Sequence, residues 1–269
     1  MNDNRFHRWR NYGRSYNPRS IDQKNISASD FLISELVESR RNFLKDTYKI
    51  NVTNSNSSLI EKSDVIILCV KPQNLFNVGE ELKGLLKPDQ LLISILAGIS
   101  INKLIDQFDH ERVIRVMPNT PAQIGEGASV WLAAEDVSVD DKSFAKNILS
   151  SLGLEIEVMD EKLIDIGTAL SGSGPAYVAL FIESLIDAAV ALGMTRDMAE
   201  KLALQTVSGT SKLMSDQNIS AVELKTMVTS PGGTTAEALM TLEKQQFRTA
   251  LMEAVYSAYK KSISLRGES

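Results

Sequence analysis

Residues 64–73, DVIILCVKPQ, are the stretch that decides the fold. The first seven are almost all apolar, and their valine and isoleucine side chains favour extended backbone. A short apolar run of this kind is typical of a strand that is covered on both faces, as in a parallel sheet. We therefore predict a buried parallel strand over residues 64–70.

Shorter extended patterns and helical patterns alternate on both sides of this strand. Further strands are predicted over residues 25–30, 50–53, 91–95, 113–117, 128–132 and 155–159. Helices are predicted between some of them, over residues 35–45, 101–108 and 140–152. Alternation of this kind predicts a doubly wound α/β domain, which we place at residues 1–160.

The strand patterns stop after Asp160, and the remaining chain predicts an all-helical second domain over residues 161–269. Helical periodicity covers residues 161–194, 196–214, 221–228 and 235–265. Residues 176–194 are apolar on nearly every face, and such a helix is buried against something. A domain of this size offers little interior for it, so we expect a homo-oligomer that forms through the helical domain.

The composition of the 269-residue chain limits the classes of function. A net charge of −5 gives no reason to expect nucleic-acid binding. The single cysteine, Cys69, and two histidines, His7 and His110, make a histidine- or thiolate-built metal site improbable. The longest apolar run, residues 177–194, is broken by two carboxylates, so no membrane span is expected. We expect a cytoplasmic protein without a metal ion.

Two helical patterns meet in the joint VTSPGGTTAEAL, residues 228–239. Ser230 is a candidate cap for the second helix, and Pro231 suits its first turn. Glycines at a helix start leave backbone N–H groups uncovered, which favours a bound anion. An ordinary helix–turn–helix joint explains the same features. The candidate anion-binding residues are Ser230, Gly232, Gly233, Thr234 and Thr235.

Three other motifs follow predicted strands, where an open α/β sheet binds its ligands. They are Cys69-Val70-Lys71-Pro72, Ala97-Gly98 and Asn119-Thr120-Pro121. Taken singly, Lys71 reads as a solvated lysine at a strand end and the last motif as a turn. Cys69 reads as a small buried filler rather than a nucleophile. The glycines of residues 171–174, SGSG, fit close packing as well as ligand approach.

These motifs together resemble the pyrroline-5-carboxylate reductase family, in its order and near its spacing. The stretches that carry the resemblance are residues 64–73, SILAGI at 94–99, RVMPNTP at 115–121, ALSGSGPAYV at 169–178 and TSPGGTTAEAL at 229–239. The resemblance implies a Rossmann-like domain followed by a helical dimerisation domain. It also implies reduction of 1-pyrroline-5-carboxylate to L-proline with NAD(P)H, the last step of proline biosynthesis.

The resemblance further implies roles for single residues. The cofactor would lie along Asn56, Cys69, Val70, Lys71, Pro72, Ala97 and Asn119. The substrate carboxylate would be held at Ser230, Gly232, Gly233 and Thr234, and Thr235 would bind the ring nitrogen as the catalytic residue. The family suggests NADP, whereas Asp30 at the end of a predicted strand would favour NAD, so both cofactors remain open.

Residues 1–20 do not fit this family, which begins with a strand, a glycine-rich turn and a helix. No G-x-G-x-x-G occurs in the chain. Codons for residues 6–20, FHRWRNYGRSYNPRS, can encode FIGGGTMGEAIIRG when they are read one base later. We therefore hypothesise two compensating frame errors. A disordered tail, a transit peptide or an expression remnant are the ordinary alternatives.

Two alternative functions stay open at this point. A related 3-hydroxyacid-type dehydrogenase would carry a catalytic lysine in the helical domain, where Lys201, Lys212 and Lys225 are present but in no such motif. The other alternative is a catalytically impaired helical dimer of the same family.

Overall fold

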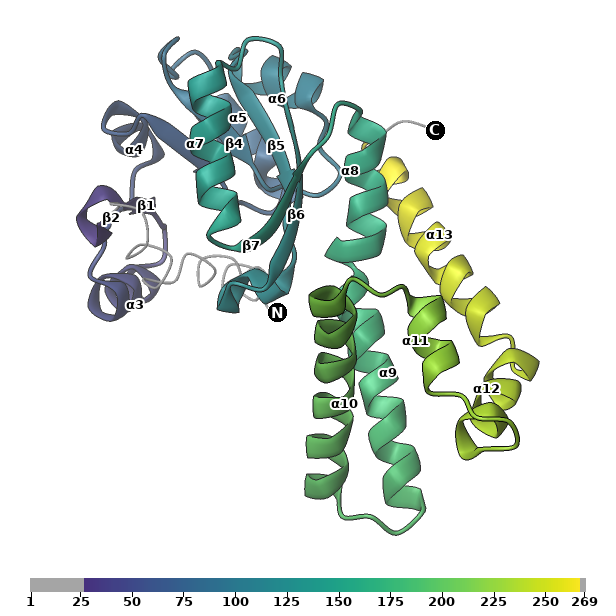
Figure 1. The fold of residues 1–269 in the computed structure, drawn as a ribbon. Coiled ribbons are helices and arrows are strands. Elements are labelled where there is room, and N and C mark those ends of the chain that lie inside the picture. Colours follow the sequence, from purple (N-terminus) through teal and green to yellow (C-terminus); the bar gives the residue numbers. More distant parts are fainter. Residues whose placement is uncertain (1–26, 267–269) are drawn as a thin grey trace. The chain divides into compact units, whose positions relative to one another are not determined.

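The computed structural model describes residues 27–266, so the hypotheses about residues 1–20 lie outside the described residues. The chain forms two compact units (Figure 1). The first comprises Met1–Ser173 together with Ala258–Ser269, and the second Gly174–Ser257. The contacts therefore divide the chain at Ser173 rather than at 160, because a helix after Asp160 and the C-terminal residues pack with the first unit.

Seven described strands belong to the first unit, and they form two sheets. The larger sheet has the order β3 (Val65–Leu68), β4 (Leu91–Ser94), β5 (Val113–Met117), β6 (Gly127–Ala133) and β7 (Gly153–Glu157). In it β3, β4 and β5 are parallel, β6 is antiparallel to β5, and β7 is parallel to β6. The smaller sheet pairs β1 (Leu32–Ser34) with β2 (Asn51–Thr53) in parallel.

Helices connect most of these strands. They are α3 (Glu38–Tyr48), α4 (Asn56–Glu61), α5 (Leu75–Leu82), α6 (Ile101–Phe108), α7 (Val139–Ser150) and α8 (Glu161–Gly167). Serine caps begin several of them: the Ser100 hydroxyl accepts from the Lys103 N–H at α6, and Ser138 accepts from Asp141 at α7. Short turns complete the unit: η2 (Ala28–Asp30), η3 (Pro72–Asn74), η4 (Thr120–Ile124) and the π-helical turn η5 (Thr168–Gly172).

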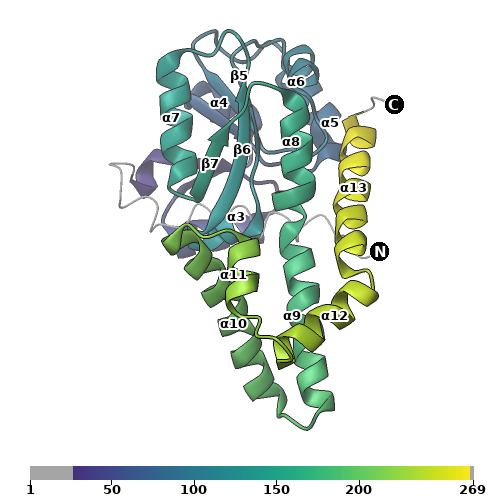
Figure 2. The same cartoon turned by 45° about the vertical axis from the view of Figure 1, so that its right-hand side comes forward.

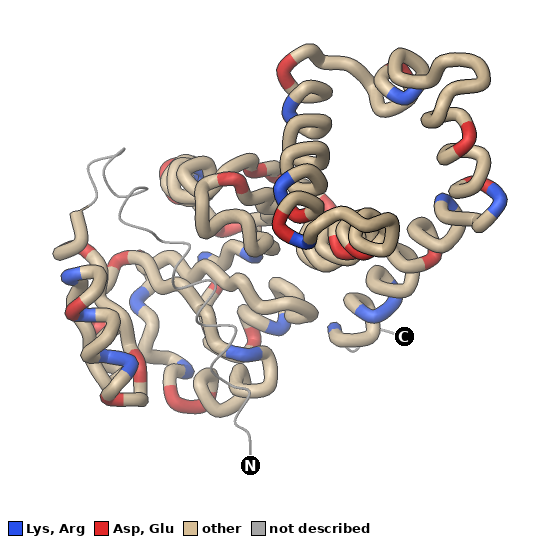
Figure 3. The backbone as a smooth tube through the Cα atoms, turned by 90° about the horizontal axis from the view of Figure 1, so that it is seen from below, with Lys and Arg blue, Asp and Glu red and all other residues tan. Residues whose placement is uncertain are grey.

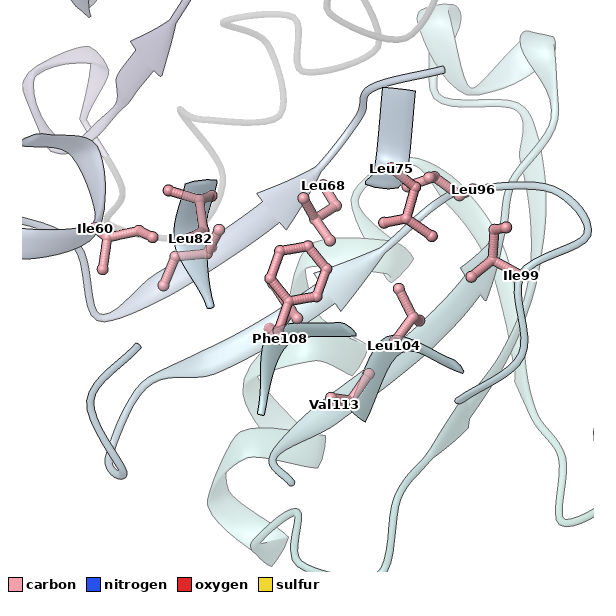
Figure 4. Packing of buried hydrophobic residues seen from close by; sticks show 11 residues of the cluster. Ile60, Leu68, Leu75, Leu82, Leu96, Ile99, Leu104, Phe108 and Val113 are labelled. Carbon is pink, nitrogen blue, oxygen red and sulfur yellow. The ribbon is translucent and has the colours of Figure 1, made fainter. Parts of the chain in front are cut away.

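The larger sheet is covered on both faces, as the apolar run at residues 64–70 predicts. On one face α5 and α6 contribute Leu75, Leu82, Leu104 and Phe108 to a core cluster (Figure 4). On the other face α7 packs against a second cluster that contains Trp131. The doubly wound fold class is confirmed.

The break between the two sheets has a specific position in this fold. A doubly wound sheet of the dinucleotide-binding type has the strand order 3-2-1-4-5-6. The pair β2–β1 corresponds to strands 3 and 2, and β3 to strand 4. The described strands are therefore interrupted where the first strand of the fold belongs.

The strand predicted over residues 25–30 is wrong in its described part, residues 27–30. Residues 28–30 form η2, and the strand begins at Leu32. A reciprocal cap stabilises this turn, since the Ser27 N–H donates to Asp30 Oδ2 over 2.7 Å while the Ser27 hydroxyl accepts from Ser29. The Asp30 carboxylate thus closes a turn before β1, and the argument that it favours NAD fails. The acidic residue that follows β1 is Glu35.

The second unit is entirely helical in the described chain. It contains α9 (Gly174–Ala191), α10 (Arg196–Gln217), α11 (Ala221–Met227), α12 (Thr234–Lys244) and the first half of α13 (Phe247–Arg266). α9 and α10 lie side by side in both views and bury Ile186, Ala199 and Ala203 (Figure 2). Two long helical patterns are each interrupted, the first by η5 and the second at Gln246, whose φ is 57°.

Large apolar side chains of the second unit remain exposed, including Leu180 on α9 at 63% and Leu192 at 91%. Lys and Arg are interspersed with Asp and Glu along the chain (Figure 3). By length and composition alone, the helical stretch Glu161–Ala191 is also apolar enough to cross a membrane. An uncovered apolar face of this extent needs a partner surface.

We expect that partner to be a second copy of the chain. Placing a carboxylate in the apolar face, as in Leu180→Asp, should shift the assembly toward the 29.6 kDa monomer in light scattering at micromolar concentration. The control is Leu85→Asp, because Leu85 is 48% exposed and lies in the first unit. A wild-type protein that is already monomeric contradicts this expectation.

Candidate active site

The first group of candidate residues lies at one edge of the larger sheet. Leu68 pairs with Ser94, and Ser94 with Arg115, so β3 and β4 end at the same level and β5 ends two residues later, at Met117. The Ile95 N–H continues this pairing to the Leu68 carbonyl over 3.2 Å. The loops after these strands therefore share one edge. The predicted residues that the structure brings to it are Cys69, Val70, Lys71, Pro72, Ala97 and Asn119.

The loop after β4 contains the smallest side chains of this edge. Ala97 is half-buried, and Gly98 is buried with a φ of +70°. A Cβ atom added at Gly98 would lie 2.5 Å from Leu265 Cβ, so no larger residue fits. Both the backbone conformation and the space require glycine at this position.

The side-chain amide of Asn119 is held in one orientation, and its NH2 group can donate to a ligand. Its side chain is 7% exposed, and Oδ1 accepts the Ala128 N–H over 2.8 Å. This bond orients the amide, and among the described residues its NH2 group makes no hydrogen bond. Asn119 can therefore offer two N–H donors to a ligand carbonyl at the sheet edge.

The residues after β3 divide into packing and turn roles. Val70 packs against the core cluster, and Lys71 begins η3, its carbonyl accepting the Asn74 N–H over 2.8 Å. Desolvation raises the pKa of the Cys69 thiol to about 12. A thiol with this pKa stays protonated at neutral pH, which agrees with a filler rather than a nucleophile.

Asn56 differs from the other predicted cofactor residues. It is the first residue of α4, and its Nδ2 donates to Glu81 Oε2 on α5 over 2.9 Å. That exposed contact ties the side chain to a neighbouring helix. Its predicted position near the adenosine end stays a prediction.

The second group of candidate residues lies in the joint between α11 and α12. The sequence predicts that Ser230 caps α12, and this prediction is wrong. The N-cap residue of α12 is Gly233. The Gly233 N–H donates to the Ser230 carbonyl over 3.1 Å, closing a turn. Pro231 at its second position and Gly232 at its third, with a φ of +68°, are the features of a type II turn. The expectation that both glycines leave uncovered N–H groups is therefore wrong for Gly233.

The first turn of α12 lacks a side-chain cap. Among the described residues the hydroxyls of Thr234 and Thr235 make no hydrogen bond. Thr241, later in the same helix, donates to the Glu237 carbonyl over 3.1 Å. First-turn residues have no helical carbonyl four positions back, so their hydroxyls stay available. Together with the first-turn N–H groups they can hold an anion.

Close packing explains Gly167, the last residue of α8, and Gly172, the first glycine of SGSG. A Cβ at Gly172 would lie 2.7 Å from Met117 Cε, and one at Gly167 equally close to Val130 Cγ2. The Ser173 N–H bonds the Thr168 carbonyl over 2.8 Å, which produces the π-helical turn. Close packing therefore accounts for Gly172, whereas a Cβ at Gly174 would meet nothing within 4 Å, so close packing does not explain that glycine.

A buried charged cluster was not anticipated from the sequence. Arg115 is 1% exposed in the middle of β5, and Asp165 on α8 is fully buried. The sequence feature that could have indicated this cluster is the single arginine inside the apolar strand VIRVM. A charge there requires a buried partner.

Comparisons with known proteins cover nearly the whole chain. A sequence model described as pyrroline-5-carboxylate reductase dimerisation matches residues 161–265, and one described as NADP oxidoreductase, coenzyme F420-dependent, matches residues 11–98. The chain is 42% identical to pyrroline-5-carboxylate reductase from Synechocystis sp. over 92% of both proteins. It is 39% identical to the Escherichia coli enzyme of that name over 82% of both.

Solved structures give the same result. The crystal structure of Plasmodium falciparum pyrroline carboxylate reductase with NADP bound superimposes with a TM-score of 0.86 at 35% identity, covering 95% of each chain. Prephenate dehydrogenase from A. aeolicus, at 10% identity and a TM-score of 0.50, shares the fold alone.

Proposed function

This chain belongs to the pyrroline-5-carboxylate reductase family, and we propose that its two groups of site residues serve NADP and substrate respectively. The reaction is the NADPH-dependent reduction of 1-pyrroline-5-carboxylate to L-proline, the last step of proline biosynthesis. The observation that carries this function is the near full-length similarity to reductases of that name.

The edge formed by β3, β4 and β5 suits the nicotinamide half of NADP. The NH2 group of Asn119 would donate to the carboxamide, and the small Ala97-Gly98 loop would admit the cofactor closely. Lys71 would approach phosphate or ribose oxygens. Bound nicotinamide supplies the hydride, so the chain itself must supply position and electrostatics.

The start of α12 suits a carboxylate. The first-turn N–H groups, with the hydroxyls of Ser230 and Thr234, would bind the substrate carboxylate. Gly233 contributes the space that a side chain would fill, since a Cβ there would lie 2.4 Å from Ser230 Oγ. The type II turn at Gly232 fixes the approach to that helix start.

Thr235 would act on the imine. Its half-buried hydroxyl would hydrogen-bond the ring nitrogen and orient C5 toward the hydride. His110, the one described histidine, is buried, and its Nε2 donates a hydrogen bond to the Gln90 carbonyl over 2.8 Å. It therefore supports the fold. The proton on the imine nitrogen would come from water, or the substrate would bind already protonated.

The assembly is a homodimer or higher oligomer in this proposal. The dimerisation match spans the second unit, whose apolar side chains are exposed in the single chain. A second copy would cover them, which explains why α9 carries so few charges. We further propose a cytoplasmic location, in keeping with a single, half-buried free cysteine.

The substitution Thr235→Val should lower kcat/KM for pyrroline-5-carboxylate roughly 10- to 100-fold, because one hydrogen bond to the ring nitrogen is lost. The matched control is Thr241→Val in the same helix, whose hydroxyl is already bonded to a backbone carbonyl. Steady-state kinetics measure both variants. Equal kinetics for the two would refute the role of Thr235.

A second candidate function, a catalytically impaired member of the family, is favoured by the sequence, in which no G-x-G-x-x-G occurs. In this fold a pyrophosphate is held by a glycine-rich turn at a helix start, and residues 1–20 contain no sequence of that kind. The chain with residues 1–20 as they stand should therefore bind NADPH weakly and reduce its substrate slowly.

Replacing residues 6–20 by FIGGGTMGEAIIRG should restore tight NADPH binding and raise turnover by roughly a hundredfold. Fluorescence titration with NADPH compares the two proteins. The control is the restored protein with alanine in place of the middle glycine in the GGG of FIGGGTMGEAIIRG. If the printed chain binds NADPH as tightly as the restored one, the expected impairment is wrong.

A further inference from the structure

The buried charged cluster joins three elements of the first unit. Arg115 Nη2 on β5 lies 3.3 Å from Asp165 Oδ1 on α8. The buried Ser262 hydroxyl on α13 donates to the same oxygen over 2.9 Å. Arg266, in the last turn of α13, places Nη1 3.2 Å from Asp165 Oδ2. Because Asp165 is fully buried, each of these hydrogen bonds and ion pairs offsets the cost of burying its charge.

Glu161 extends this cluster to the loop after β4. Its Oε1 accepts from Arg115 Nη1 over 2.6 Å and also from the Ile101 N–H over 2.9 Å. Ile101 is the first residue of α6, so its N–H has no partner within that helix. Arg266 Nη1 lies 3.8 Å from the other carboxylate oxygen of Glu161. One carboxylate therefore links β5, the end of the loop and the last turn of α13.

The same turn of α13 lies directly on the middle of that loop. The Leu265 side chain and backbone occupy the space beside Gly98, leaving no room for a Cβ atom there. The strand side of the loop is fixed as well, through the Ile95 N–H and the Leu68 carbonyl. Ala97, between these fixed points, is the predicted cofactor contact.

We propose that Glu161 and Arg266 are positioning residues that hold the loop of residues 95–101 in its cofactor-binding shape. This inference rests on the proposed function only for the identity of the ligand. The C-terminal turn presses the loop at Gly98, the carboxylate of Glu161 fixes it at Ile101, and Arg266 secures the turn. A loosened loop costs binding free energy, because it must be ordered when NADPH binds.

A cluster that served stability alone would behave differently. Its loss would lower the melting temperature and loosen the whole sheet, whereas loss of a positioning device loosens the loop first. The decisive observable is therefore local, and it can be measured without cofactor or turnover.

The test is hydrogen–deuterium exchange on the full chain carrying Arg266→Ala. Amides in the peptide covering residues 95–101 should exchange roughly tenfold faster, while the peptide covering β3 keeps its protection. The milder variant Glu161→Gln, which keeps the side-chain shape, should accelerate exchange at Ile101. Arg248→Ala is the control, because Arg248 lies on α13 but pairs with Glu243 at an exposed site.

NADPH titration provides the second readout. In Arg266→Ala the dissociation constant for NADPH should rise about tenfold, with the KM for pyrroline-5-carboxylate within twofold of wild type, and Arg266→Lys should recover most of the loss. Unchanged loop exchange in both variants, or equal acceleration in β3, overturns the proposal. Neither exchange nor NADPH binding requires turnover, so failure to reduce pyrroline-5-carboxylate counts against the proposed function alone.

Discussion

The parallel pairing of β3, β4 and β5 is the constraint on which the rest of the structure depends. Leu68, Ser94 and Arg115 are in register, β3 and β4 end at this level and β5 ends two residues later, so their loops meet at one edge. That edge receives a lysine, a small Ala-Gly loop and an oriented asparagine. The strands are buried between α5 and α6 on one face of the sheet and α7 on the other. This packing keeps the register, since a one-residue slip of a strand would move its side chains from one core cluster to the other.

The two proposed groups of site residues would each use backbone geometry more than side-chain chemistry. At α12 the useful groups are N–H donors and threonine hydroxyls that the helix itself cannot satisfy. At the sheet edge Gly98 provides space and Asn119 provides donors. This arrangement suits a hydride transfer, in which the cofactor carries the reactive electrons and the protein aligns two ligands.

Much of this follows from the sequence. The strand at residues 113–117 and the helix at 101–108 have the predicted bounds, because their apolar periodicity is unambiguous. The errors have local causes: a Ser27–Asp30 cap replaced the first predicted strand, and Gly233 replaced Ser230 as the cap of α12. The cluster of Arg115 and Asp165 joins residues 50 positions apart, and no local pattern reports such a contact.

In the proposed reaction this chain transfers a hydride from NADPH to the imine carbon of pyrroline-5-carboxylate. The most direct measurement uses NADPH that carries deuterium at both positions of nicotinamide C4, with high concentrations of the printed chain and mass spectrometry of the product. Hydride transfer to C5 should yield proline with one deuterium at C5, even if it forms slowly. NADPH oxidation without labelled proline, or no proline after prolonged incubation, would contradict it.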